Sequence, residues 1–157
     1  MDTSKEYAGR FPVYYSEERA RSCHYSNIIG KSPLGLAELR VRPVHWSSVA
    51  DLASYRIDTV RSYVNSPEFD QLVSDGKIRV VQSADGDENM ANLVEGKVDA
   101  ALIDRNVYAY LLKKNPRLKG EELQLRLNEK TLMVHRLYVC FSRMKRGVYY
   151  ETGLIRD

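Results

Sequence analysis

The sequence has few cysteines and no long hydrophobic run, and both absences exclude classes of protein. Its two cysteines, Cys23 and Cys140, match neither a CxxC motif nor a Cys/His metal spacing. Unpaired cysteine is among the most often buried residue types, so the sequence predicts two free, buried thiols. No apolar stretch reaches the length that spans a bilayer, and the segment MDTSKEYAGRF lacks the apolar centre of a signal peptide. If this chain is the natural gene product, the expected location is the cytoplasm.

A strong imbalance of charge is also missing. The 24 basic and 21 acidic residues are mixed along the chain and leave a formal charge of +3, so charge alone does not indicate a nucleic-acid partner. The three histidines are scattered, and no Ser, Cys or His stands beside an acid at a recognisable catalytic spacing. We therefore expect no catalytic residue, no metal site and no cofactor. A length of 157 residues with 43% hydrophobic residues is typical of one soluble domain with a real core.

Strand and helix signals alternate through the middle of the chain. Strands are predicted at 55–60, 78–82 and 98–103, and helices at 67–74, 88–95 and 106–114. This alternation predicts an α/β fold, a three-layer sandwich whose sheet is mostly parallel and has antiparallel crossing strands. The strand at 98–103 is almost entirely apolar and ends at Asp104, and open α/β sheets bind ligands at the carboxyl ends of their strands.

The flanking segments carry weaker signals. Before the alternation we expect a short strand at 11–15, a short helix after Ser16, a connection over 27–35, a strand at 36–42, and a short helix capped by Ser47 or Ser48. After the alternation, strands are expected at 123–127 and 132–142, followed by a shortened helix or strand over 143–157.

Three segments together resemble a known family. They are SEERARSCHYSNII at 16–29, SSVADLASYRIDTVRSYVNSPEF at 47–69 and LVEGKVDAALID at 93–104. They resemble the (S/T)xxR, DLxGxxVGVxxGT and LxxGxxDAxxxD segments of the periplasmic amino-acid-binding type of extracellular solute-binding protein, family 3, which has the type 2 periplasmic-binding fold. The order and approximate spacing match as well, which is more specific than any one motif.

The resemblance implies a domain organisation. Residues 1–10 would be a loose leader, 11–43 a remnant of lobe one with a crossing segment, 44–130 the α/β domain of lobe two, and 131–157 the return strand with part of lobe one. The family's signal peptide and first βαβ units precede its (S/T)xxR segment, and Gly153-Leu154 resembles the start of its last lobe-one helices. We therefore expect a version truncated at both ends. By resemblance the location would be periplasmic.

The resemblance also implies a ligand site. At the matching positions, Arg19 would grip a ligand α-carboxylate with its planar guanidinium, and Asp104 would take the α-ammonium group. Ser62, Asn65 and Ser66 would supply hydroxyl and backbone donors at a helix N-terminus. These five residues would form a clamp for a zwitterion.

Each candidate also has a structural alternative. Arg19 can be a solvated helix residue that pairs with Glu17 or an i+4 neighbour, and Asp104 can cap the helix that follows it, with or without a ligand. Asn65, Ser66 and the following proline make a good helix start whatever they bind. Asp99 is interpreted as structural, a residue that ties a turn.

One departure from the family's pattern bears on the ligand. Where the family has the glycines of a GxxxG turn, this chain has Asp58 and Ser62, with Arg61 and Tyr63 beside them. Glycine permits close backbone approach and positive φ. Side chains at these positions are expected to crowd a small ligand.

Two functions from different classes follow. The first is a solute-binding module of the ABC-transporter receptor type, which binds a small polar, amino-acid-like ligand without chemistry and has a membrane permease as its partner. The second is a non-catalytic interaction protein of the same fold, stabilised as a homo-oligomer that covers the apolar segments 11–15 and 132–141. An enzyme is a weaker interpretation, because no catalytic spacing is recognisable. The effector domain of a transcription regulator is also weaker, because no helix-turn-helix precedes the domain.

Overall fold

The structure is a computed structural model that describes residues 8–143. Two units make it up: unit 1 contains the described residues up to Ser32 and from His135 onward, and unit 2 contains Pro33–Val134. Strands β3 (Gly30–Leu39) and β7 (Leu125–Ser142) each contribute to both units. The expectations for residues 1–7 and 144–157, including the similarity at Gly153-Leu154, lie outside the described residues.

The sheet of unit 2 has parallel strands at its centre and antiparallel strands beside them. Its strand order is β7-β3-β6-β4-β5. Strand β4 (Ile57–Val60) is parallel to both β5 (Val80–Ser83) and β6 (Ala100–Asp104), whereas β3 is antiparallel to β6. The predicted α/β class, with a parallel sheet and antiparallel crossing strands, is confirmed.

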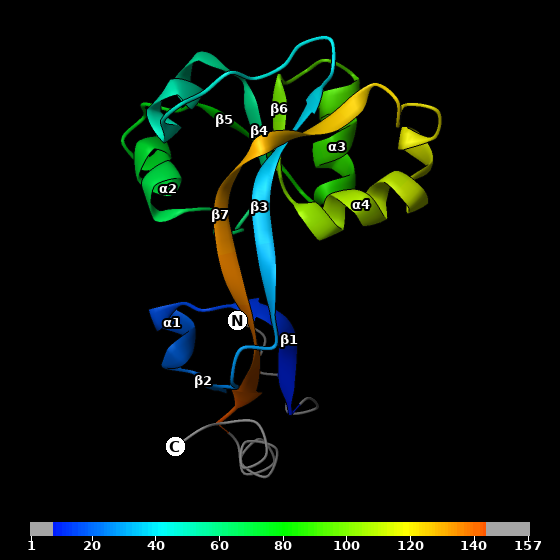
Figure 1. The fold of residues 1–157 in the computed structure, drawn as a ribbon. Helices are drawn as coiled ribbons and strands as arrows, with labels where there is room; N and C mark the ends of the chain where they lie inside the picture. The colour runs from blue at the N-terminus through cyan, green and yellow to red at the C-terminus, as the bar shows by residue number, and fades with distance from the viewer. Residues whose placement is uncertain (1–7, 144–157) are drawn as a thin grey trace. The chain divides into compact units, whose positions relative to one another are not determined.

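Helices cover both faces of this sheet (Figure 1). The short helix η1 (Val49–Ser54) and α2 (Pro67–Ser74) pack on one face, and α3 (Gly86–Val94), α4 (Arg105–Lys114) and η2 (Pro116–Leu118) pack on the other. Strand β6 supplies both cores, because Ala100 and Leu102 face one layer while Ala101 and Ile103 face the other. Burial on both faces is the reason for its nearly continuous apolar sequence.

Local capping explains where the helices begin. The Ser66 hydroxyl accepts a hydrogen bond from the backbone N–H of Phe69 at the start of α2, and Pro67 occupies the first helical position as predicted. At η1 the cap is Ser48, which forms a capping box with Asp51. These starts depend on neighbours three residues apart and were therefore predictable.

Two expectations about the crossing strands are wrong. Residues 27–35 are not only a connection, because β3 already begins at Gly30. The strands expected at 123–127 and 132–142 are one continuous strand, β7. Gly30, Pro33 and Gly35 weaken the local strand signal, but pairing of Leu34–Glu38 with β6 overrides it.

The strands of unit 1 pair with the C-terminal part of β7. Strand β1 (Gly9–Tyr14) and strand β2 (Cys23–Tyr25) both pair with β7 antiparallel, and helix α1 (Glu17–Ala20) lies between them in the sequence. The predicted strand at 11–15 and the short helix after Ser16 are thus confirmed, while β2 was not predicted. The rings of Tyr15 and Tyr138 both contact that of Tyr25, with centroids 5.0 and 5.4 Å away.

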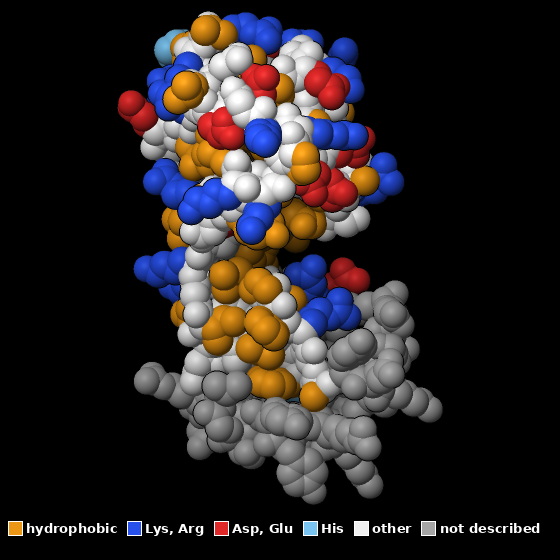
Figure 2. Space-filling view, turned by 90° about the vertical axis from the view of Figure 1, so that its right-hand side faces the viewer, with side chains coloured by type: hydrophobic (Ala, Val, Ile, Leu, Met, Phe, Trp, Pro, Cys, Tyr) orange, Lys and Arg blue, Asp and Glu red, His pale blue; other side chains and the backbone are white. Residues whose placement is uncertain are grey.

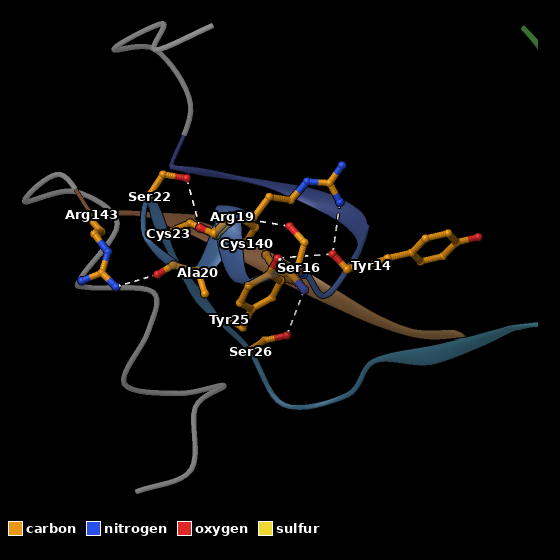
Figure 3. Close-up of a disulfide and its surroundings, with 11 residues drawn as sticks. Tyr14, Ser16, Arg19, Ala20, Ser22, Cys23, Tyr25, Ser26, Cys140 and Arg143 are labelled. Atoms are coloured by element: carbon orange, nitrogen blue, oxygen red, sulfur yellow. Dashed lines mark hydrogen bonds between the residues drawn. A yellow bond between two sulfur atoms is a disulfide. The ribbon is translucent and has the colours of Figure 1, made fainter. Parts of the chain in front are cut away.

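The prediction of two free thiols is wrong. Cys23 and Cys140 are both buried and form a disulfide that ties β2 to β7 (Figure 3). Pairing of Tyr25 with Cys140 in the β2–β7 ladder brings the two cysteine Cα atoms within 5.5 Å, although 117 positions separate them in the sequence. Sequence spacing could not reveal this, because it depends on which strands pair.

Among the described residues, no helix combines the length and apolar character that crossing a membrane requires.

Reducing the disulfide should destabilise the protein markedly. Because the bond closes a loop of more than 100 residues, its loss is expected to lower the free energy of unfolding by about 3 to 5 kcal/mol. Thermal unfolding with and without a reductant measures this. The C23S/C140S double variant serves as control, since its unfolding should not respond to reductant. Alkylation of both cysteines in unfolded, unreduced protein would contradict the bond.

Candidate functional site

Asp104 lies at the carboxyl edge of the parallel strands of unit 2. It is the last residue of β6 and the N-cap of α4, where one carboxylate oxygen, Oδ1, accepts hydrogen bonds from the backbone N–H groups of Asn106 (2.7 Å) and Val107 (2.9 Å). The capping alternative is therefore confirmed. The side chain is half-buried, so part of it still reaches the surface at this edge. A carboxylate at this position can receive a cationic group from a ligand.

The turn after β4 belongs to the same edge. The backbone N–H of Arg61 donates to the carbonyl of Ser83 (2.9 Å), and that of Tyr63 donates to the carbonyl of Val60 (3.2 Å). Between them, Ser62 has φ +64°, a left-handed conformation that glycine adopts most easily. The chain thus keeps the backbone shape of a glycine turn with a serine in place. Ser62, Arg61 and Tyr63 are all exposed there.

Asn65 and Ser66 are buried and engaged in the start of α2. The Asn65 side-chain amide donates to Asp70 Oδ1 (2.9 Å) and its backbone N–H donates to Asp70 Oδ2 (3.1 Å), while the Ser66 hydroxyl caps the helix. The interpretation of these two residues as a helix start is confirmed. Of the five predicted site residues, four thus lie in unit 2, and three of those occupy the single segment between β4 and α2.

Asp58, at the family's other glycine position, does not crowd the surface. Its side chain is fully buried and accepts hydrogen bonds from the Ser83 hydroxyl (2.6 Å) and the Asn92 amide (2.7 Å). The carboxylate links β4 to β5 and α3 inside unit 2. The expectation of crowding is therefore wrong for Asp58, because β4 is buried on both faces and leaves no side chain of the strand at the surface.

Asp99 has the structural role predicted for it. Its carboxylate accepts a hydrogen bond from the backbone N–H of Arg56 (2.8 Å) and pairs with the Arg56 guanidinium at 2.8 Å. The Arg56 side chain, which is the main cause, holds the pKa of the Asp99 carboxyl below its ordinary value. This pair ties the segment before β4 to the segment before β6, at the opposite end of the strands from Asp104.

Arg19 lies in unit 1 on the four-residue helix α1. The helix is capped by the Ser16 hydroxyl, and Nη1 of Arg19 donates to the carbonyl of Tyr14 (3.1 Å), as Figure 3 shows. The side chain is half-buried. Within the described part of the chain no carboxylate forms an ion pair with Arg19, so the alternative pairing with Glu17 is not formed.

No metal centre is evident in residues 8–143, where no three His, Cys, Asp or Glu side chains are grouped to hold an ion. Together, the carboxyl edge of unit 2 offers the Asp104 carboxylate and the exposed side chains of Arg61, Ser62 and Tyr63. Such groups can bind a small polar molecule by charge and hydrogen bonding.

No protein-family model matches the sequence, and no curated protein sequence matches it. Solved structures do match the fold. An arginine-bound mutant of ArgBP from T. maritima aligns with a TM-score of 0.70 at 14% identity, covering 89% of this chain and 62% of that chain. AbpA, an amino acid ABC transporter substrate-binding protein from Streptococcus pneumoniae bound to L-arginine, aligns with a TM-score of 0.68 at 16% identity, covering 88% and 56%.

The GluR0 ligand binding core in complex with L-glutamate aligns with a TM-score of 0.67 at 18% identity, covering 91% of this chain and 64% of that chain. The chain therefore spans about three fifths of the length of these structures. At such low identity the similarity concerns the fold alone. At that level, the predicted resemblance to amino-acid-binding solute-binding proteins is confirmed.

The left-handed backbone at Ser62 leads to a test of the turn. Glycine adopts this φ without strain, so S62G should leave the free energy of unfolding unchanged or raise it by up to about 1 kcal/mol, whereas S62V should lower it by about 1 kcal/mol or more. Urea denaturation measures both. The matched control is A109G at an exposed position inside helix α4, which is expected to destabilise by about 0.5 to 1 kcal/mol. Equal destabilisation by S62G and A109G would refute the left-handed turn.

Proposed function

We propose that the protein is a solute-binding module that binds a small polar ligand of the amino-acid type and does no chemistry on it. One observation carries the proposal: the Asp104 carboxylate stands at the carboxyl edge of parallel strands, where α/β sheets bind ligands. The fold, shared with arginine-bound and glutamate-bound proteins, supports the ligand class.

The proposed roles follow from the chemistry of each side chain. Asp104 would pair with the ligand ammonium through the part of its carboxylate that reaches the surface. In unit 1, Arg19 is the proposed partner for a carboxylate group, for which the planar guanidinium offers two parallel donors. Ser62 is exposed and can offer its hydroxyl directly, whereas the buried Asn65 and Ser66 would hold the turn and the start of α2 in place.

A receptor of this kind would deliver its ligand to a membrane permease. That role places the protein outside the cytoplasm, and the Cys23–Cys140 disulfide supports such a location because structural disulfides persist in oxidising compartments. The periplasm is the compartment we propose.

A ligand panel tests the binding function. Unfolding is measured by heat in the presence of single amino acids, including arginine, glutamate and cysteine, and of small polar acids. A true ligand at about 100 times its Kd should stabilise the protein by about 2.7 kcal/mol. D104N should abolish this shift while keeping the helix cap, since asparagine caps as well as aspartate. R19Q should reduce the stabilisation that the ligand produces.

The matched control for these variants is E95Q, which changes an exposed acid at the opposite end of α3, away from the carboxyl edge of the strands. Its ligand response should equal that of the unchanged protein. A folded protein whose melting temperature shifts with no compound of the panel would overturn the proposal, as would a D104N variant that binds as tightly as the unchanged protein.

The alternative function, an interaction protein that works as a homo-oligomer, is favoured by the surface of unit 1. Figure 2 shows hydrophobic side chains gathered on the side of unit 1 that it displays. Among the described residues of this unit, the large exposed hydrophobic ones are Phe11, Tyr15, Ile28 and Ile29. Soluble monomers rarely expose large contiguous apolar patches, so a second copy would cover this one.

Sedimentation velocity checks this alternative. If it holds, the protein should sediment as a dimer or larger species at micromolar concentration, and F11S/I29S should shift the population toward monomer without unfolding it. V41S, at an exposed valine of unit 2, is the control and should leave the distribution unchanged. A well-folded monomer at micromolar concentration would eliminate the alternative.

A further inference from the structure

A hollow with a volume of about 500 Å³ lies in unit 2. Two segments form most of it: the stretch after β3 and the first half of β7. Its lining residues are Val44, His45, Trp46, Ser47, Asp51, Arg126, Asn128, Glu129 and Lys130. The volume is within the range usual for small-molecule sites.

This hollow is separate from the candidate site at Asp104. In the β3–β6 ladder, Leu34 pairs with Asp104 at the carboxyl end of β6, and Glu38 pairs with Ala100 at its amino end. The Glu38 carboxylate is bonded to the backbone N–H of Val44 (2.8 Å) and to Nε of Arg126 (2.7 Å). The hollow therefore lies beside the amino end of β6, about 13 Å along the strand from Asp104 by the rise per residue.

The floor of the hollow is fixed by a fully satisfied side chain. Asn128 is buried, and its amide donates to Glu38 Oε2 (2.9 Å) and to the carbonyl of Val44 (2.8 Å). Its carbonyl oxygen accepts from the indole N–H of Trp46 (3.2 Å) and from the backbone N–H of Lys130 (3.1 Å). With all four positions filled, Asn128 holds the Trp46 ring in one orientation.

Two basic side chains supply hydrogen-bond donors around this floor. Arg126, Asn128 and Lys130 alternate along β7 and so share one face of the strand, and Glu129 also lines the hollow. Arg126 uses Nε for the fully buried Glu38, and among the described residues none accepts from its two Nη groups. Lys130 Nζ donates to the carbonyl of Trp46 and lies 5.5 Å from the centre of its ring.

Asp51, another acid that lines the hollow, is engaged by the backbone beside it. Asp51 Oδ2 already accepts the backbone N–H groups of Ser47 (2.7 Å) and Ser48 (2.8 Å). These two hydrogen bonds hold the pKa of the Asp51 carboxyl below its ordinary value. Asp51 is thus engaged in the capping box of η1, whereas the two Nη groups of Arg126 have no acceptor among the described residues.

We infer that this hollow binds a small aromatic carboxylate. The carboxylate would accept hydrogen bonds from the two Nη groups of Arg126 and from Lys130, and the ring would stack on the Trp46 indole. Such a ligand matches two features of the hollow: its ring can stack on the indole of Trp46, and its carboxylate can accept from the donors of Arg126 and Lys130. The inference is independent of the proposed function, since it uses none of the residues assigned to the amino-acid site.

Trp46 is the only tryptophan in the sequence, so its fluorescence reports directly on this hollow. Titration with benzoate, excited where benzoate does not absorb, should change the emission in a saturable way with a millimolar or lower Kd. Benzyl alcohol, which keeps the ring and lacks the carboxylate, should bind at least tenfold more weakly. Acetate, which lacks the ring, should also bind at least tenfold more weakly than benzoate.

Three variants make the test specific. K130Q should weaken benzoate binding several-fold, and R126K, which keeps a charge beside Glu38 and removes the paired Nη donors, should weaken it about tenfold. D104N should bind benzoate unchanged, which distinguishes the two sites. A linear, unsaturable response, or equal affinity in the unchanged protein, K130Q and R126K, would overturn the inference. Loss of benzoate binding in D104N would do so as well.

Discussion

Burial of β6 on both faces is the constraint on which the architecture of unit 2 depends. Its side chains alternate between two cores, and its backbone is paired with β3 on one side and β4 on the other. Both helical layers therefore pack against the same strand, each through alternate residues of it. Asp104 comes at the end of this strand, where the enclosure ends and α4 begins, and this position makes a carboxylate both structurally useful as a cap and accessible to a ligand.

Two buried carboxylates complete the interior of unit 2. Asp58 on β4 is satisfied by Ser83 and Asn92, and Glu38 on β3 is satisfied by Val44, Arg126 and Asn128. An uncompensated buried charge would cost several kcal/mol, so each carboxylate favours the one arrangement that brings its partners together. Asp58 specifies how β4 meets β5 and α3, while Glu38 specifies how β3 meets β7 and, through Asn128, shapes the hollow beside Trp46.

Unit 1 achieves order in another way. It pairs two short strands with β7 and adds the Cys23–Cys140 bond, and its four-residue helix presents Arg19. Few apolar side chains are buried among the described residues of unit 1, and a covalent link stabilises such a unit because it restricts the unfolded chain. The same bond keeps α1 and β2 attached to the strand that unit 1 shares with the rest of the chain.

The sequence by itself determined the features that depend on near neighbours. Contacts within a few residues determine the caps at Ser66 and Asp104 and the place of Pro67 at the first position of α2. They also determine the alternation of strands and helices, from which the α/β class follows. Tertiary structure alone decided the Cys23–Cys140 pairing and the extension of β3 through residues 30–35, because both depend on strand pairing between distant segments. It also decided the burial of Asp58 and the left-handed backbone of Ser62. Both depend on which elements pack against β4 and against the turn that follows it.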